Sequence, residues 1–372
     1  MNRQIKVLMV VPNLRVSNGV ASFAMSYYRN LNHERVKMDF VCYGNIESPY
    51  PHEIQECGDK VFFLPKVKNI ANHIKKCKEI IDEGHYDIIH VNSLLITYPL
   101  LQVAKKKVKV RLLHSHNTVM GDTKRKELRN RIFLPFLLNS CNYFAACSTI
   151  AGNALFGKRP FTVIPNVIQS QKYKYNEQIR MIKREQENCC EKVVICAVGR
   201  LAHQKNPFFA IDVIEKLMEE RQDVIFWWIG SGGLNQEVAE YASKKRFADR
   251  ITLFGSREDV AELYQAMDVF FLPSKFEGFG LACLEAQASG LPCVISDQYP
   301  QEINVTGNVL QVPLNDSVDN WKRALLCAEK KYVDREEAFF AVNKSIFDAK
   351  VSGSVLESLY GDIISKEIGG KK

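Results

Sequence analysis

The sequence lacks the patterns that mark structural metal sites and disulfide frameworks. Its 11 cysteines form no C-x-x-C pair and have no histidines at a matching spacing, so neither a zinc site nor a set of disulfides is indicated. Free cysteines are typical of a reducing compartment, and we therefore expect the protein in the cytoplasm. Internal repeats and low-complexity segments are also missing, which favours ordinary globular domains.

Long hydrophobic runs are missing as well. No apolar run reaches the ~18 residues of a membrane-spanning helix. The N-terminal stretch MNRQIKVLMVVPNL enters a predicted strand too soon for a signal peptide. With 372 residues, of which 46% are hydrophobic, the chain is long enough to bury two cores, so we expect two domains.

Apolar runs and amphipathic segments alternate along the chain. Strands are predicted at residues 5–11, 38–43, 87–91, 108–114, 142–147 and 161–164, and again near Val193, Val224, Ile251, Val269 and residues 292–296. Helices are predicted at residues 20–31, 70–82 and 177–187, from about Leu281, and at 352–368. This alternation indicates an α/β protein with two doubly wound domains. A polar stretch at 169–191 separates them, and we divide the chain into residues 1–186, 187–351 and a final helical segment, 352–372.

The most informative segment is KFEGFGLACLEAQASGLP, residues 275–292, which follows an apolar strand pattern. Glu277 falls on the loop before the next helix, and Glu285 lies eight positions later, in the first turns of that helix. At ~1.5 Å per helical residue, this separates the two carboxylates by roughly the length of a nucleotide diphosphate sugar.

The start of that helix lies between the two carboxylates. The backbone amides of Phe279, Gly280 and Leu281 are predicted there, where unpaired N–H groups and the positive end of the helix dipole favour a phosphate. A carboxylate, an anion-binding turn and a second carboxylate stand in the order that a sugar, a diphosphate and a ribose would require.

A second segment, GRLAHQKN, directly follows the apolar strand at 193–198. Gly199 provides the turn, and Arg200 and Lys205 leave the C-terminal end of the strand, where open α/β sheets bind ligands. Arginine supplies a planar fork for phosphate oxygens and lysine a mobile point charge. A glycine turn, GSGG, begins at Gly230 after the next strand.

With these segments in view, the chain resembles the retaining glycosyltransferases of family 4, which have the GT-B fold of two Rossmann-like domains facing a central cleft. The resemblance rests on Glu277 and Glu285 as the E-x7-E motif, on Arg200 and Lys205 as the diphosphate pair, and on the glycine turn at Gly230. It implies transfer of a sugar from a nucleotide diphosphate, with UDP expected on family frequency alone, to an acceptor hydroxyl with retention at the anomeric carbon.

The resemblance also implies a role for each residue of the donor site. Arg200 and Lys205, with the helix-end amides, would stabilise the leaving diphosphate. Glu277 would hold sugar hydroxyls, and Glu285 would accept hydrogen bonds from the ribose. The final helix would cross back onto the first domain.

Two N-terminal motifs, SNGVASF at 17–23 and LLHSHNT at 112–118, are similar to those of the exopolysaccharide and capsule-type members. In this comparison Gly19 would allow close backbone approach to the ligand. His116 is favoured over His114 as the residue that contacts the donor sugar, because it is better placed to leave the sheet; His114 is equally compatible with a buried core histidine.

No D-x-D triplet occurs anywhere in the chain, and this removes the usual metal-binding motif of the other large transferase fold. We therefore expect no obligatory metal and no cofactor, the nucleotide sugar being a substrate. The proposed partners are this donor and a glycan or lipid-linked acceptor.

Other interpretations remain open at this stage. Each site residue taken alone is compatible with a surface charge or an ordinary turn, and the joint spacing is what favours a binding site. A sugar-nucleotide epimerase, a glycogen-type phosphorylase and a non-catalytic partner subunit share the fold. The first needs its own carboxylate constellation and the second a much longer chain, whereas loss of Lys205 or Glu277 would favour the third, and both are present.

The positive charge is unevenly distributed. Residues 1–187 hold 29 Lys and Arg against 15 Asp and Glu, whereas residues 188–372 hold 21 against 27. Much of the excess lies in residues 105–131. A solvated surface explains it, and so does attraction to an anionic membrane or a lipid-diphosphate acceptor, which would place the protein at the inner face of the cell membrane. Nucleic acid is disfavoured because no binding motif accompanies the charge.

Overall fold

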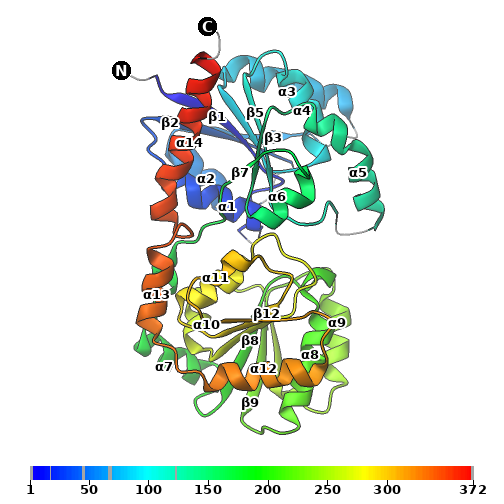
Figure 1. The fold of residues 1–372 in the computed structure, drawn as a ribbon, viewed down its shortest axis with the longest axis vertical. Coiled ribbons are helices and arrows are strands. Elements are labelled where there is room, and N and C mark those ends of the chain that lie inside the picture. The colour runs from blue at the N-terminus through cyan, green and yellow to red at the C-terminus, as the bar shows by residue number, and fades with distance from the viewer. Residues whose placement is uncertain (1–2, 17, 44–46, 66–68, 122–123, 370–372) are drawn as a thin grey trace. The chain divides into compact units, whose positions relative to one another are not determined.

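The computed structural model describes residues 3–16, 18–43, 47–65, 69–121 and 124–369. The chain forms two compact units: the first consists of Met1–Val167 with Ala349–Lys372, and the second of Ile168–Asp348. Each unit contains one sheet with helices packed against it (Figure 1). Ser17 of the SNGVASF motif and residues 370–372 of the predicted final segment lie outside the described residues.

The first unit has a seven-stranded sheet in the order β3-β2-β1-β4-β5-β6-β7. Its strands are β1 (Ile5–Val10), β2 (Val36–Tyr43), β3 (Val61–Leu64), β4 (Ile88–Val91), β5 (Val110–Ser115), β6 (Tyr143–Ala146) and β7 (Thr162–Val163). Its helices are α1 (Gly19–Tyr28), α2 (Tyr50–Glu56), α3 (Ile70–Gly84), α4 (Tyr98–Ala104), α5 (Lys124–Leu138), α6 (Thr149–Phe156) and α14 (Ala349–Gly369).

The second unit has a six-stranded sheet in the order β10-β9-β8-β11-β12-β13. Its strands are β8 (Val193–Val198), β9 (Val224–Ile229), β10 (Ile251–Gly255), β11 (Val269–Leu272), β12 (Cys293–Ser296) and β13 (Val309–Val312). Its helices are α7 (Glu177–Gln186), α8 (Pro207–Met218), α9 (Asn235–Ser243), α10 (Val260–Ala266), α11 (Leu281–Ala288), α12 (Val318–Lys330) and α13 (Arg335–Asn343).

Every described strand pairing is parallel, so the carboxyl ends of all strands in a sheet lie along one edge. In both sheets the strand order reverses once, between β1 and β4 and between β8 and β11. Open parallel sheets bind ligands at such a reversal, beyond the carboxyl ends of the strands. The predicted α/β class with two doubly wound, Rossmann-like units is confirmed.

The core of the first unit is completed by the last helix. Leu356, Tyr360 and Ile363 of α14 are buried in the same apolar cluster as strands β1 and β2 and helix α1. An apolar helix stripe must be covered to be stable in water, and here the stripe of α14 closes the core of a unit whose other elements precede residue 168.

The predicted boundary at 186/187 is wrong, because α7 belongs to the second unit. Arg180 donates to Asp268 Oδ1 over 2.6 Å, and Arg184 donates to the carbonyl of Ala266 over 2.7 Å. These bonds tie α7 to the residues that lead into β11. The polar composition of residues 169–191 resembles a linker, but its two arginines serve as anchors.

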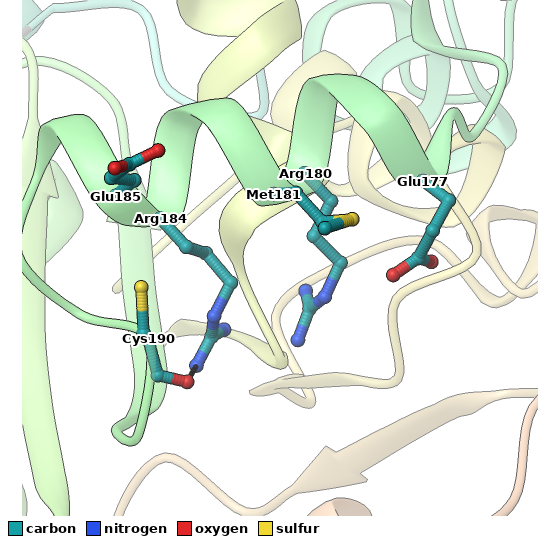
Figure 2. Close-up of a pocket in the computed structure, with 6 residues that line it drawn as sticks. All are labelled: Glu177, Arg180, Met181, Arg184, Glu185 and Cys190. Carbon is teal, nitrogen blue, oxygen red and sulfur yellow. Dashed lines mark hydrogen bonds between the residues drawn. The ribbon is translucent and has the colours of Figure 1, made fainter.

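Figure 2 shows a pocket beside α7. This hollow has a volume of about 480 Å³. The hollow is lined by Glu177, Arg180, Met181, Arg184, Glu185 and Cys190. Arg184 also donates to the carbonyls of Cys189 and Cys190, so both guanidinium groups of the hollow already have protein acceptors. We therefore assign these two arginines a structural role and do not propose the hollow as a ligand site.

The sequence pattern missed two strands at the edges of the sheets. β3 is mostly half-buried and β13 contains the exposed residue Leu310, so neither shows the continuous burial of a central strand. The remaining predicted strands and helices are present, with ends that differ by a few residues. Among the described residues, no helix has the length and apolar content needed to cross a membrane.

Candidate functional site

The central feature of the second unit is an ion pair at the carboxyl ends of β8 and β11. Lys205 Nζ lies 2.5 Å from Glu277 Oε1, and both side chains are largely buried, with exposed fractions of 14% and 6%. The two residues flank the reversal of strand order, so the fold brings together two charges that are 72 positions apart in the sequence. The roles predicted for them are separate, and their direct pairing was not anticipated.

Gln204 holds the two loops of this pair together. Its side-chain amide donates to the carbonyl of Phe276 over 3.0 Å and lies 3.5 Å from Glu277 Oε2, while its own carbonyl accepts from the amide of Lys275 over 2.7 Å. Glu277 is therefore contacted on both oxygens. Arg200, by contrast, is exposed, and its guanidinium lies 3.5 Å from Gln204 Oε1, which leaves it available to a ligand.

The predicted glycines Gly199 and Gly230 lie against each other where β8 and β9 end. A Cβ atom on Gly230, whose φ is +129°, would be 2.3 Å from the carbonyl oxygen of Gly199. That oxygen also accepts from Trp228 Nε1 over 2.9 Å. The requirement for glycine at position 230 thus has a steric cause within the protein, and ligand contact is not needed to explain it.

Helix α11 begins at the predicted turn. Gly280 precedes it with φ of +103°, and a Cβ atom there would be 2.3 Å from the ring of Tyr299. No side chain of the described residues caps α11, so its first amides keep the unpaired N–H groups of a helix start. Phe279 is buried against Phe347, with ring centroids 4.8 Å apart, and this contact fixes the turn from the other side. Leu281 is the first residue of the helix, as predicted.

Glu285 lies on the second turn of α11 beside two tyrosines. Tyr264 donates to Glu285 Oε2 over 3.2 Å, and Tyr173 also contacts the carboxyl group. Burial raises the pKa of Glu285 to about 7, against the opposing effect of these hydroxyls and of Lys172. The carboxyl group is therefore partly protonated near neutral pH and can both donate and accept hydrogen bonds.

In the first unit, the predicted His116 lies just after β5, and Asn92 lies just after β4. The two side chains are joined by a contact of 2.7 Å between His116 Nε2 and Asn92 Oδ1. Burial lowers the pKa of His116 to about 4, so its imidazole is neutral at pH 7. The ring of His114 packs against that of His116, and the ring of His90 packs against that of His114.

The predicted His114, on β5, and His90, on the neighbouring strand β4, are core residues. His90 Nδ1 is 2.6 Å from the hydroxyl of Tyr360, and His90 Nε2 is 3.0 Å from His114 Nδ1. Both side chains are buried, and burial lowers the pKa of His90 to about 3 and that of His114 well below its ordinary value. The structure thus separates His116, which is half-buried, from the two histidines behind it.

Gly19 is the first residue of α1, close to the carboxyl end of β1. A Cβ atom on it would lie in open space among the described residues, and its φ is ordinary. Asn18 caps the helix by accepting from the amides of Val20 and Ala21, so these amides are not available to an anion. Nothing within the fold requires glycine at position 19, and its predicted ligand contact remains a prediction.

The arrangement in the second unit combines an exposed cation at Arg200, a buried Lys205–Glu277 pair and an uncapped helix start, all near one reversal of strand order. No group of three or more His, Cys, Asp or Glu side chains in the described ranges has the arrangement of a metal site. Chemically, these groups can hold a polyanion and bind hydroxyl groups beside it.

Comparison with known sequences decides the family. The sequence model described as "Glycosyl transferases group 1" matches residues 178–334, and the model described as "Glycosyltransferase Family 4" matches residues 17–172. The chain belongs to glycosyltransferase family 4. Together the two matches include both predicted motifs of the donor site and both N-terminal motifs.

Among curated relatives of this family, the chain is 27% identical to the putative glycosyltransferase EpsF of Bacillus subtilis over 341 residues, covering 87% of each chain. It is also 27% identical over 316 residues to the UDP-Gal:alpha-D-GlcNAc-diphosphoundecaprenol alpha-1,3-galactosyltransferase of Escherichia coli, covering 78% of this chain and 77% of the relative. Both relatives are thus similar to the chain over most of their own length.

Solved structures share the fold. Anabaena Alr3699/HepE in complex with UDP and glucose superimposes with a TM-score of 0.76 at 16% identity, covering 96% of this chain and 100% of the other. WaaG, a glycosyltransferase involved in lipopolysaccharide biosynthesis, gives a TM-score of 0.69 at 14% identity over 96% of this chain and 99% of the other. These comparisons confirm the predicted GT-B fold.

Sequence reasoning missed Gln204, Asn92 and Tyr264. Gln204 directly precedes the predicted Lys205 on the loop after β8, and Asn92 directly follows β4. A polar residue beyond the carboxyl end of a predicted strand is the signal that would have identified them. Tyr264 lies on α10, 21 positions from Glu285, and no local pattern in the sequence connects the two.

Proposed function

We propose that this family 4 glycosyltransferase transfers a sugar, with retention of anomeric configuration, from a UDP-sugar to a hydroxyl of a glycan or lipid-linked acceptor in polysaccharide biosynthesis. The observation that carries the proposal is the Lys205–Glu277 pair beside the uncapped start of α11. The names of the relatives support the donor and acceptor class, because one of them uses UDP-Gal and a diphosphoundecaprenol-linked sugar.

The two charges of the pair are proposed to bind different parts of the donor, Lys205 the diphosphate and Glu277 the sugar. An ammonium group donates up to three hydrogen bonds, and Glu277 uses one of those of Lys205. The others can bind the oxygens of the departing diphosphate, where negative charge develops as the glycosidic bond breaks. Arg200 and the first amides of α11 are proposed to contact the same diphosphate.

The two carboxylates are proposed to hold opposite ends of the donor. Glu277, fixed by Lys205 and Gln204, would accept hydrogen bonds from sugar hydroxyls. Glu285 would bind the ribose hydroxyls, and its partly protonated state allows it to donate as well as accept. His116 would contact the sugar from the first unit.

Substitution of the two cations tests the diphosphate role. Arg200→Ala and Lys205→Ala should each lower turnover by at least about a hundredfold, the effect of losing one positioned charge stabiliser. Lys205→Ala also leaves Glu277 buried without its cation, which costs roughly 3 kcal/mol of stability, so unfolding is measured alongside activity. Lys244→Ala, at the exposed residue that follows α9, is the matched control. Near-normal turnover of Arg200→Ala and Lys205→Ala would remove both residues from the mechanism.

The two carboxylates are distinguished by nucleotide binding. Glu277→Gln should reduce transfer more than Glu285→Gln, while Glu285→Gln should weaken binding of free UDP, measured by calorimetry. If Glu277→Gln abolished UDP binding and Glu285→Gln left it intact, the two assignments would be reversed.

A lipid-linked acceptor requires the enzyme to reach a membrane surface, and α5 is the element best suited to this. Leu128, Ile132 and Phe136 lie four positions apart on one face of the helix and are 55–62% exposed, and Phe133 is 43% exposed. The helix also carries several of the basic residues in 105–131. Exposed apolar side chains beside cations are typical of helices that bind anionic lipid.

Vesicle sedimentation tests this contact. The protein should bind vesicles containing phosphatidylglycerol at low salt and leave them as ionic strength rises. Replacing Lys124, Arg125, Lys126 and Arg129 with Gln should weaken vesicle binding and transfer to a lipid acceptor, with UDP binding unchanged. Met181→Ser on α7, an exposed apolar residue of the second unit, is the control. Equal sedimentation of wild type and the quadruple variant would leave the basic stretch as a solvated surface and indicate a soluble acceptor.

A further inference from the structure

The side chain of Asn92 is held in one orientation by its neighbours. Its Nδ2 group lies 3.2 Å from the carbonyl oxygen of Val10 and 3.3 Å from that of His90, and it also contacts the sulfur of Met9. All three neighbours are acceptors. If the amide were turned by 180°, Oδ1 would face two carbonyl oxygens, and the buried NH2 group would lose all three acceptors. The amide therefore points Nδ2 toward the sheet and Oδ1 away from it.

The orientation of Asn92 determines which nitrogen of His116 carries the proton. Asn92 Oδ1 is only an acceptor, and it lies 2.7 Å from His116 Nε2. Nε2 must therefore be the N–H group. A neutral imidazole has one N–H and one lone pair, so the lone pair is on Nδ1. The burial of His116 favours this neutral form at pH 7.

We propose that Asn92 is a positioning residue that holds His116 as the Nε2–H tautomer, so that Nδ1 is the nitrogen lone pair that His116 offers to a ligand hydroxyl. Asn166 also borders His116 in the free protein. His116 Nδ1 is buried and has no hydrogen-bond partner among the described residues, so its lone pair is unsatisfied in the free protein.

The histidines behind His116 follow the same pattern of protonation. The hydroxyl of Tyr360 remains protonated, because burial raises its pKa, and it can donate to His90 Nδ1. His90 then carries its proton on Nε2 and donates to His114 Nδ1. His114 in turn carries its proton on Nε2, on the side of its ring away from His90. In this arrangement Nε2 is the protonated nitrogen of each neutral ring, and no two protons compete for one of the three contacts.

This assignment restricts the chemistry of the proposed site. If His116 contacts the donor sugar, as the proposed function requires, it does so as a hydrogen-bond acceptor at Nδ1, while its proton stays on Nε2 in the hydrogen bond to Asn92 Oδ1. His116 then orients a sugar hydroxyl and does not protonate the leaving group. The tautomer itself is a property of the free protein and can be measured without any substrate.

Nuclear magnetic resonance provides the direct test. In protein labelled with ¹⁵N at histidine, the long-range couplings from the ring carbon-bound protons distinguish the two neutral tautomers. At a pH of about 7.5 we expect His116, assigned by its loss in His116→Gln, to show a protonated Nε2. An Nδ1–H tautomer of His116 in the wild-type protein would overturn the proposal.

Two substitutions of Asn92 distinguish a role in positioning His116 from a purely structural role. Asn92→Ala should remove the acceptor and leave His116 as a mixture of tautomers or as Nδ1–H, with transfer reduced by roughly tenfold to a hundredfold. Asn92→Asp keeps an acceptor opposite His116, so it should restore the Nε2–H tautomer and raise the pKa of His116. Its second oxygen then faces the carbonyls of Val10 and His90, so the variant should also be less stable, and its unfolding is measured alongside. Asn153→Ala, at an exposed position on α6, is the control and should change neither. A pure Nε2–H tautomer in Asn92→Ala would show that Asn92 does not determine it.

Titration with UDP-galactose separates this inference from the proposed function. A shift of the Nδ1 resonance of His116 on binding supports both. If the free protein has the Nε2–H tautomer but the donor binds without any change at His116, the positioning by Asn92 stands and the sugar contact of His116 is refuted.

Discussion

Mild acid should selectively unfold the first unit. Its three clustered histidines, His90, His114 and His116, are neutral when folded because burial lowers their pKa values, to about 3 for His90 and about 4 for His116. Their ordinary value is 6.5. A histidine whose pKa is lower in the folded state stabilises that state above the unfolded pKa, and the stabilisation is lost as the pH falls.

The size of the effect follows from the unfolded pKa. At about pH 5 the three folded groups are still neutral, whereas each has taken up a proton in the unfolded chain, so each costs about 2 kcal/mol relative to pH 7.5. Three groups cost about 6 kcal/mol, comparable with the whole stability of many domains. Asp59 opposes this, because burial raises its pKa, so the sum is an upper value.

The second unit should respond in the opposite direction. The pKa of Glu285 is raised from 4.5 to about 7, so the folded state binds this proton more tightly, and stability increases as the pH falls through 7. Between pH 7.5 and 5 the gain is about 2 kcal/mol. The stability of the first unit relative to the second should therefore fall between pH 7.5 and pH 5.

Tryptophan fluorescence and circular dichroism distinguish the units. All three tryptophans, Trp227, Trp228 and Trp321, lie in the second unit, so their fluorescence reports that unit alone, whereas circular dichroism reports both. In urea at pH 5, the dichroism should change at lower denaturant than the fluorescence. His90→Phe should reduce the loss by about 2 kcal/mol, and His52→Gln, at a largely exposed side chain, should not. Coincident transitions with unchanged midpoints at both pH values would refute the reasoning.

Two further predictions concern the second unit. Glu285→Gln should remove the rise in stability of this unit between pH 7.5 and 5, which fluorescence-detected urea unfolding measures; an unchanged rise would assign it to another group. Gly280→Ala should destabilise the second unit by about 2 kcal/mol or more in thermal melts, because φ is +103° and the added methyl would meet Tyr299. Gly361→Ala on α14 is the control. Its methyl would meet open space among the described residues, so this variant should be neutral or slightly stabilising. Equal melting temperatures for the two alanine variants would contradict the strained turn.

The sequence was sufficient to predict the fold and the donor-site segments because each depends on a local pattern. Apolar runs predict buried strands such as β8 and β11, and the glycine at position 280 predicts the turn before α11. These signals extend over a few residues, so no knowledge of the other unit or of distant strands is needed.

The missed features depend on contacts between distant residues. The pairing of Lys205 with Glu277 arises only after β8 and β11 lie side by side, and the bond between Asn92 and His116 requires β4 beside β5. The assignment of α7 failed for the same reason, since composition alone does not show which strand its arginines contact. Local patterns identify candidates, and the sheet decides which of them meet.

The division of the first unit has a consequence for the order of events on the ribosome. Tyr360, whose hydroxyl contacts His90, is 270 positions from it, and α14 is synthesised only after the whole second unit. The second unit is continuous and can fold as soon as residues 168–348 have emerged. The first unit begins the chain, but its apolar face stays uncovered and His90 Nδ1 lacks the Tyr360 hydroxyl until α14 has been synthesised. The usual order, in which the N-terminal domain folds first, is thus reversed for the final step.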